Sequence, residues 1–309
     1  MKKISLSGGR AAAGKPRVQS IEQGKGNCLS RIQAMVGARQ RGAFKIAKYV
    51  LAHSREAVDS TISQLAEKTG SSGATVSRFC TRMGYENYRS FQIDLAASLA
   101  SAPSPASDIF TSSDKPSTII KRIFELNRQS LVNTEGLLSD KMLSRVAKLI
   151  INSRRTVLFG SGSSGFTAKL GAVRFQGLGI TTLAVTDPYE SLLALSSVTR
   201  EDVVIGISHT GRSTLITKLM KLACEKGART VGITNYLNSP LAELPEFVLP
   251  TSFREHKINA AVCYSGIAQM CILDTLYFLA AYYQGPKFER MALQVEEAAE
   301  KLLRTNGKQ

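Results

Sequence analysis

The chain has 309 residues, of which 43% are hydrophobic and 21% are charged, a balance typical of folded domains in water. This composition excludes disorder of the whole chain. A membrane-spanning protein is also excluded, because no apolar run reaches about 18 residues. At roughly 100–200 residues per domain, the length predicts two domains.

The charge is strongly basic and unevenly distributed. Lysine and arginine number 40 against 24 for aspartate and glutamate, which gives a net charge of +16. Residues 1–100 hold 16 of the basic and only 6 of the acidic side chains. Such a surplus attracts polyanions, so the first third of the chain predicts binding to double-stranded DNA, with a merely soluble basic surface as the alternative.

The cysteine and histidine positions indicate the cellular location and whether a metal site is expected. The five cysteines include no CxxC pair, and the three histidines are scattered along the chain. This pattern indicates reduced thiols and no metal site. No apolar run follows Lys2 and Lys3, so we expect no signal peptide and a cytoplasmic location.

The N-terminal third divides into a tail, a helical domain and a linker. Residues 1–27 lack periodicity and predict a disordered basic tail. Residues 28–101 predict an all-α DNA-binding domain with five helices, which the apolar spacing places over 29–36, 44–51, 62–66, 76–83 and 91–99. Residues 102–116 contain three prolines and predict a linker.

Residues 117–309 predict an α/β domain. Helical patterns at 117–135 and 140–152 come first, and short apolar runs then alternate with helices. The predicted strands are 156–159, 181–185, 202–207, 230–234 and 247–249, and the predicted helices between and after them are 165–177, 189–198, a helix ending at 226, and 259–283. This alternation favours a five-stranded parallel sheet with helices on both faces, flavodoxin- or Rossmann-like.

A helix-turn-helix pattern lies inside the first domain. Gly70 supplies the left-handed residue that ends a short helix, and Ser72 stands at the N-cap of the next helix. The second helix of such a motif enters the major groove of DNA, whereas a generic helical hairpin is the alternative. Val76, Phe79 and Cys80 should face the core. The candidate exposed or DNA-contacting residues are Ser72, Gly73, Thr75, Ser77, Arg78 and Arg82.

Two loops in the second domain predict a phosphate site. The first predicted strand leads into Gly160–Gly165, a G-x-G-x-x-G pattern, and Asp187 follows about 20 residues later, as in dinucleotide-binding folds. The third predicted strand leads into Ser208–Thr214, which is rich in hydroxyls and opens another helix. Hydroxyls and free amides at a helix N-terminus suit a phosphate monoester, although both loops could be simple capped turns.

These motifs resemble the RpiR family of bacterial transcription regulators, in which a helix-turn-helix domain precedes a sugar isomerase (SIS) domain. The resemblance covers about Leu29–Leu303. It rests on Leu65-Ala66, Thr75-Val76, Arg78-Phe79-Cys80, Gly84-Tyr85, Tyr88, Gly160–Ser164, Ser208–Arg212, Thr234-Asn235, Ser239–Leu241 and Ala268-Gln269 with Asp274. The Ser208–Arg212 loop and Pro286–Phe288 look most like the HexR branch, which senses a phosphorylated sugar-acid intermediate.

The resemblance implies ligand-binding residues. The ligand phosphate would be held by Ser163, Ser164, Ser208, Thr210, Ser213 and Thr214. Gly162 and Gly211 are further ligand-binding positions, and Glu255 would lie near the sugar hydroxyls. Ser71 stands where the family has an apolar turn residue, which would loosen the helix-turn-helix. Gly266 stands where the family has arginine, which puts ligand choice in doubt.

The leading prediction is therefore a DNA-binding regulator of carbohydrate metabolism that responds to a phosphorylated sugar or sugar acid. We expect a homodimer or homotetramer, no cofactor and no enzymatic activity. One alternative is a sugar-phosphate isomerase, for which Glu255, His256 and His209 are the candidate bases. The other is a regulator that senses NAD(H) through the Gly160–Gly165 loop and Asp187.

Overall fold

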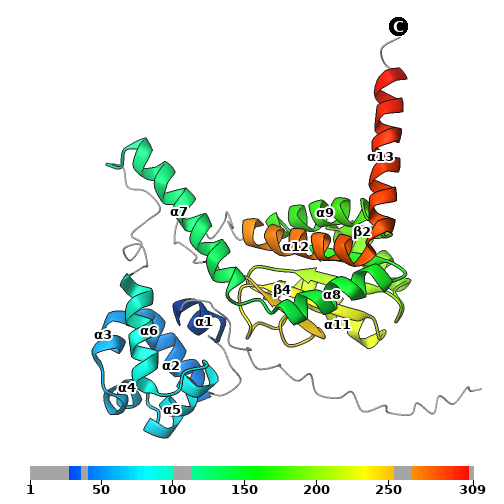
Figure 1. Ribbon diagram of the computed structural model, residues 1–309. Coiled ribbons are helices and arrows are strands. Elements are labelled where there is room, and N and C mark those ends of the chain that lie inside the picture. Colours follow the sequence, from blue (N-terminus) through cyan, green and yellow to red (C-terminus); the bar gives the residue numbers. More distant parts are fainter. Residues whose placement is uncertain (1–27, 36–40, 101–112, 254–265, 306–309) are drawn as a thin grey trace, which may run out of the picture.

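The computed structural model describes residues 28–35, 41–100, 113–253 and 266–305 (Figure 1). The expected basic tail, residues 101–112 of the linker region and the candidate ligand residue Glu255 lie outside these ranges. Residues 259–265, the predicted start of the last long helix, also lie outside them.

The N-terminal domain is all helical in its described part. Its helices are α1 (Cys28–Met35), α2 (Arg41–Ala52), α3 (Ser54–Asp59), α4 (Ile62–Lys68), α5 (Gly73–Arg82) and α6 (Tyr88–Ala100). Five helices were predicted, and α3 is the one that the periodicity missed. It has six residues and buries only Ala57 completely, so it produces no repeating apolar pattern.

The mostly aliphatic core of this domain contains an aromatic contact, and a partly buried ion pair lies beside it. Phe79 of α5 and Phe91 of α6 meet edge to face, with ring centroids 5.9 Å apart. Arg31 of α1 donates to the Met83 carbonyl (3.1 Å) and pairs with Asp94 of α6. Arg31 therefore ties α1 to α6 and to the chain that leaves α5, which fixes the orientation of α5.

The C-terminal domain contains the predicted parallel sheet. Its elements are α7 (Pro116–Glu135), α8 (Asp140–Asn152), β1 (Thr156–Gly160), α9 (Ser163–Gln176), β2 (Thr182–Val185), α10 (Pro188–Ser196), β3 (Val203–Ile207), α11 (Thr214–Glu225), β4 (Arg229–Thr234), β5 (Phe247–Pro250), α12 (Gly266–Gln284) and α13 (Pro286–Thr305). The strand order is β2-β1-β3-β4-β5, and every neighbouring pair is parallel. This is the flavodoxin-like order rather than the dinucleotide-binding order.

Helices cover both faces of the sheet, as predicted (Figure 1). Leu158 of β1 packs with α8, α9 and α12 in one buried cluster. Its neighbours Val157 and Phe159 point to the other face and pack with α10 and α11. The strands are thus buried on both sides, which explains their nearly continuous apolar sequences.

All five predicted strands are present, but two helices differ from prediction. The helix after β1 begins at Ser163, two residues early, because Gly162 is its N-cap. Helix α13 was not predicted at all; Gly285 (φ +53°) ends α12, and Pro286 starts the new helix. None of the described helices is long and apolar enough to span a membrane.

Candidate functional site

The helix-turn-helix has the predicted local geometry. Gly70 has φ +56°, and the Ser71 amide donates to the Ala66 carbonyl at 2.8 Å, which closes the end of α4. The Ser72 hydroxyl accepts from the Thr75 amide at 3.3 Å and caps α5. Ser71 is half-buried, with its hydroxyl 3.5 Å from the Thr69 carbonyl. The turn therefore accommodates serine at this position.

The outward face of α5 differs in part from the prediction. Ser77, Arg78 and Arg82 are exposed, as expected, and Val76, Phe79 and Cys80 are buried. Gly73 and Thr75, which were expected to be exposed, are instead half-buried. The Thr75 hydroxyl lies 2.9 Å from that of Ser72, so these two hydroxyls are partners of each other at the start of the helix. The exposed face also includes Ala74 and Thr81, three residues before Ser77 and four after it.

A lysine outside the predicted set lies beside the turn. The Lys45 ammonium of α2 is 3.7 Å from the point where a side chain on Gly70 would begin. Lys45 and Lys48 are both exposed on α2. Two lysines at i, i+3 on an outward helix face were the available sequence signal. They add positive charge next to the recognition helix, where DNA phosphates would lie.

The two loops of the α/β domain lie side by side. Gly160 at the end of β1 pairs with Ile207 at the end of β3, so the loops that follow leave the same edge of the sheet. Helix α9 continues on one face and α11 on the other. The order 2-1-3-4-5 makes the β1/β3 boundary the topological switch point, where a ligand crevice forms in open α/β sheets.

The first loop is shaped by two glycines. A side chain on Gly160 would begin 2.4 Å from the Ser164 carbonyl oxygen, and Gly162 has φ +57°. Gly162 has no side chain to cap α9. The Gly165 amide donates to the Gly162 carbonyl (3.0 Å), and the amides of Ser163 and Ser164 receive no side-chain cap. Ser163 is exposed and Ser164 is buried. The loop thus offers helix-terminal amides, one exposed hydroxyl (Ser163) and one buried hydroxyl (Ser164).

The second loop is held by the end of β4. The His209 carbonyl accepts from the Asn235 amide (2.9 Å) and the Thr234 hydroxyl (3.1 Å). Gly211 (φ +62°) packs so closely that an added side chain would begin 1.9 Å from the Ser239 hydroxyl. The Gly211 carbonyl accepts from Leu241 at 3.0 Å. These contacts fix the backbone of the loop before any ligand arrives.

The hydroxyls of the second loop can still donate outward. Ser208 accepts from the Gly211 amide (3.1 Å), and Thr210 accepts from the Arg212 amide (3.2 Å). A hydroxyl that accepts a hydrogen bond retains its own proton for an anion. Ser213 is the N-cap of α11 without a side-chain cap bond, and Thr214 begins the helix, exposed. The predicted residues of both loops therefore lie at two neighbouring helix N-termini.

A buried glutamine that was not among the predicted ligand residues reaches the first loop. Gln269 of α12 is fully buried, and its Oε1 accepts from the Ser164 hydroxyl at 3.3 Å. Its amide nitrogen has no hydrogen-bond partner within the described part of the chain. A buried, unsatisfied donor beside the loop is a candidate ligand contact. Gly266, in place of the family's arginine, starts the same helix one turn earlier.

A second missed residue connects the loops to α7. The Asn235 side chain accepts from the Phe253 amide (2.6 Å) and donates to the Phe253 carbonyl (3.1 Å). The neighbouring Ser252 is bonded on both sides by α7, through the hydroxyls of Ser130 (2.7 Å) and Thr134 (2.9 Å). The second loop, the chain after β5 and α7 therefore form one hydrogen-bonded series.

Asp187 does not have the position of a ribose-binding carboxylate. Its Oδ1 accepts from the amides of Tyr189 (2.8 Å) and Glu190 (3.0 Å) and caps α10. The interpretation of Gly160–Gly165 with Asp187 as a dinucleotide fingerprint is thus weakened by both the cap and the strand order.

Comparison with known proteins identifies the family. A helix-turn-helix domain of the rpiR family matches residues 26–102, and a SIS domain matches residues 149–279. An uncharacterised HTH-type transcriptional regulator of Thermotoga maritima is 30% identical over 255 residues, which cover 82% of this chain and 91% of that protein. The chain belongs to the RpiR family.

The RpiR-family assignment confirms the resemblance found in the sequence. The relatives include the transcriptional regulator HexR of Pseudomonas aeruginosa, 28% identical over 272 residues, or 88% of this chain and 95% of HexR. The NanR protein of Vibrio vulnificus, solved in complex with ManNAc-6P, shares the fold with a TM-score of 0.57 at 22% identity. That match covers 89% of this chain and 99% of the NanR chain. This RpiR-family chain is thus an HTH-type transcriptional regulator with a SIS domain.

Proposed function

We propose that this regulator senses a phosphorylated sugar or sugar acid in the crevice between the β1 and β3 loops. One observation carries the proposal: two helix N-termini, α9 and α11, open from adjacent strands and are lined by hydroxyls. Helix N-termini favour anions, and serine or threonine hydroxyls donate to phosphate oxygens. The phosphate would contact Gly162, Ser163, Ser164, Ser208, Thr210, Gly211, Ser213 and Thr214, with Glu255 at the sugar hydroxyls.

Gln269 adds a reason to expect a polar sugar. Its amide nitrogen has no hydrogen-bond partner among the described residues, and its amide oxygen accepts from Ser164. Donation from this nitrogen to a ligand oxygen would remove the cost of burying it unpaired. The NanR protein, with the same fold, was solved with a sugar phosphate, which supports this class of effector.

Ligand binding would weaken or strengthen DNA binding through α7. Helix α7 follows the linker region and is bonded near its C-terminal end to Ser252, beside the Asn235 clamp. Closure of the second loop on a ligand would move this series and alter the spacing of the helix-turn-helix domains. A preference of about 1–3 kcal/mol for one arrangement changes DNA affinity about 5–150-fold.

We further propose that the protein acts as a homodimer or homotetramer in the cytoplasm. Helices α9 and α12 pack side by side and expose an apolar surface, consisting of Phe166, Leu170, Val173, Ile267, Phe278 and Tyr282. A contiguous apolar surface of this kind is typical of a protein interface. Two subunits would supply the two recognition helices that an operator with two half-sites needs.

An isomerase is less favoured than a sensor. It would need a base within about 3 Å of the sugar C–H proton. His209, a candidate base within the described residues, is buried, with its ring against Tyr236 and Phe253 (centroids 5.9 and 6.3 Å apart). That setting suits a structural role for the ring. Turnover of a sugar phosphate by the pure protein would restore the enzyme hypothesis.

A thermal-shift panel tests the proposal, with sugar phosphates, phosphorylated sugar acids, amino-sugar phosphates and NAD(H). A ligand at about 100 times its Kd adds roughly 2.7 kcal/mol of stability. The variant Ser163→Asp places a negative charge at the exposed start of α9 and should lose the shift. Thr181→Asp adds the same charge at the opposite end of the strands and should keep it.

DNA binding provides the second readout. Both variants should bind DNA like the wild type in the absence of ligand, because neither lies in the helix-turn-helix domain. A shift with NAD(H) alone, or a phosphosugar shift that survives Ser163→Asp, would contradict the proposed site.

A further inference from the structure

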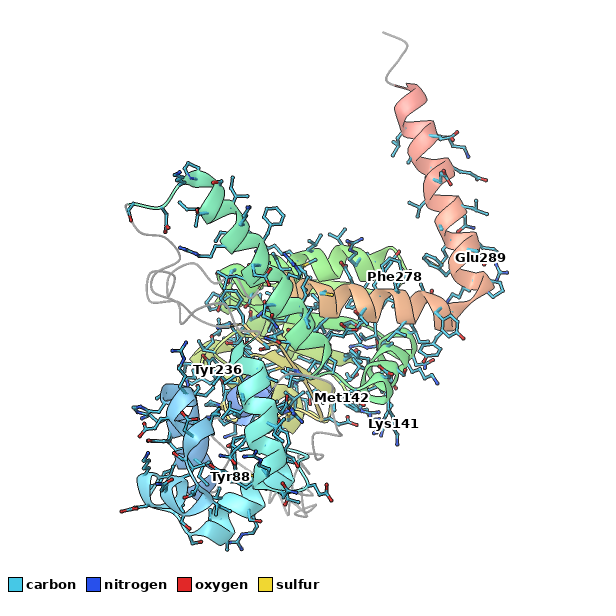
Figure 2. All side chains as sticks on the ribbon, turned by 60° about the vertical axis from the view of Figure 1, so that its left-hand side comes forward. Tyr88, Lys141, Met142, Tyr236, Phe278 and Glu289 are labelled. Atoms are coloured by element: carbon cyan, nitrogen blue, oxygen red, sulfur yellow. The ribbon has the colours of Figure 1, made fainter. Side chains whose placement is uncertain are left out.

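The C-terminal helix α13 extends away from the rest of the domain (Figure 1). Only its first turns are anchored: the Phe288 ring lies 6.3 Å from that of Tyr277, and Met291 occupies the space beside Gly179. Figure 2 shows Glu289 at this base, with the side chains beyond it directed outward around the helix. Farther along, Val295 is 60% exposed.

The exposed helix has an apolar stripe. Phe288, Val295 and Leu302 recur every seven residues. At about 100° per residue, these three fall on one side together with Met291, Ala292, Ala298 and Ala299. Leu293 lies outside the stripe, although it is equally exposed at 59%. Most of the stability of a helix in a protein comes from packing of its apolar face, so the stripe calls for a partner.

The charges beside the stripe are sorted by sign. One flank consists of Lys287, Gln294 and Lys301, and the other of Glu289, Glu296 and Glu300. In a parallel pair related by a two-fold axis, the basic flank of each helix lies beside the acidic flank of the other. In an antiparallel pair, the two basic flanks would face each other, and so would the two acidic flanks. The charge pattern of α13 therefore complements an identical helix in the parallel orientation.

We propose that α13 pairs in parallel, through its apolar stripe, with α13 of a second copy of this chain. The pairing rests on the proposed homo-oligomer and specifies one of its contacts. Phe278 and Tyr282, part of the apolar surface described above, lie on the last turns of α12 directly before α13. The paired helices would continue that surface away from the sheet.

The first test compares two substitutions of equal exposure. In the full-length chain, Val295→Glu should raise the dissociation constant of the oligomer at least tenfold in sedimentation velocity or light scattering. Leu293→Glu should leave it unchanged. Both positions are exposed, so circular dichroism should give the same melting curve for the diluted protomers. Equal effects of the two substitutions, or none, would overturn the proposal.

The second test reads the orientation. In a chain with Cys263 and Cys271 replaced by serine, Leu302→Cys should form a disulfide between two copies, because a parallel pair brings residue 302 of each helix together. Leu293→Cys should not. If instead only the combined Phe288→Cys and Leu302→Cys chain cross-links, through residue 288 of one copy and 302 of the other, the pair is antiparallel and the proposal fails.

The result is separable from the proposed effector function. If Val295→Glu leaves the dimer intact and the protein still responds to a phosphosugar, only the α13 proposal fails. If the α13 helices pair but the protein shows no response to a phosphosugar, only the effector proposal fails. Alternatively, α13 could pack on the α9/α12 surface of another copy. Val295→Glu would then dissociate the oligomer, but Leu302→Cys would form no disulfide between two copies. That result would also overturn parallel pairing.

Discussion

The Ser130 hydroxyl of α7 donates a 2.7 Å hydrogen bond to the carbonyl of Ser252, 122 residues later in the chain. Both residues are buried, and the hydroxyl of Thr134, one turn further along α7, accepts a hydrogen bond from the Ser252 amide (2.9 Å). The peptide after β5 is thus held at both polar groups by one helix. That helix follows the linker region, so the route proposed above from the ligand loops to the DNA-binding half runs through this contact.

Ser130→Ala should uncouple the two halves. Losing one hydrogen bond costs about 1 kcal/mol, or about fivefold in an equilibrium constant. We expect the effect of the phosphosugar on DNA affinity to shrink about fivefold, whereas the Kd for the sugar itself changes little. Fluorescence anisotropy with a duplex selected from a random library measures both. Ser117→Ala, exposed on the first turn of α7, is the control, and an unchanged coupling in Ser130→Ala would contradict the route.

Arg78 and Lys45 should have different roles on DNA. Arg78 lies on the outward face of α5, and its replacement by alanine should cost about 1–3 kcal/mol and relax the sequence preference. Lys45→Ala should weaken all sequences alike and reduce the salt dependence of log K by about one. Anisotropy titrations at several salt concentrations distinguish the two, with Lys218→Ala on α11 as the control. An Arg78→Ala protein with full sequence preference would count against α5 as the reading helix.

Gly211→Ala should disrupt the second ligand loop. The added methyl would meet the Ser239 hydroxyl at 1.9 Å, and φ +62° is strained for any side chain. Strain and overpacking together should lower the free energy of unfolding by about 2–5 kcal/mol and abolish the thermal shift with phosphosugar. Gly73→Ala is the matched control, since nothing lies within 4 Å of the added methyl. Urea denaturation of both variants provides the comparison, and a stable, ligand-responsive Gly211→Ala chain would refute the role of the loop.

The buried thiols of the N-terminal domain should make it sensitive to alkaline pH. Burial raises the pKa of Cys28 and of Cys80 from 9.0 to about 12 in the folded chain. The unfolded chain therefore loses these protons first as the pH rises. Stability is complete below pH 9 and should then fall by about 1.4 kcal/mol per pH unit for each thiol.

Urea denaturation between pH 8 and 9.5 measures this effect where most tyrosines of the unfolded chain, with an ordinary pKa of 10.0, remain protonated. A chain with Cys28→Ala and Cys80→Ala should be less stable at pH 8 but should show a flatter decline. The same slope in both chains would show that other groups cause the alkaline loss.

Local chemistry made much of this protein predictable from its sequence. Gly70 and Ser72 specified the turn of the helix-turn-helix, because a left-handed residue and an N-cap act within a few residues. The alternation of apolar runs and helices gave all five strands. The same logic failed for α3, which is too short to show a period, and for α13, where only Phe288 and Met291 at the base of the stripe pack on the described part of the domain.

The site shows where local chemistry stops. The two Ser/Thr-rich helix starts and the recognition helix could be predicted from sequence, because caps, glycines and periodic burial are encoded within one or two turns. That β1 and β3 are neighbours, that Gln269 reaches Ser164 and that Ser252 bonds to Ser130 became evident from the folded chain. Contacts across 105 and 122 residues depend on how the layers pack, and a linear pattern of apolar residues records that a side chain is buried but not against what.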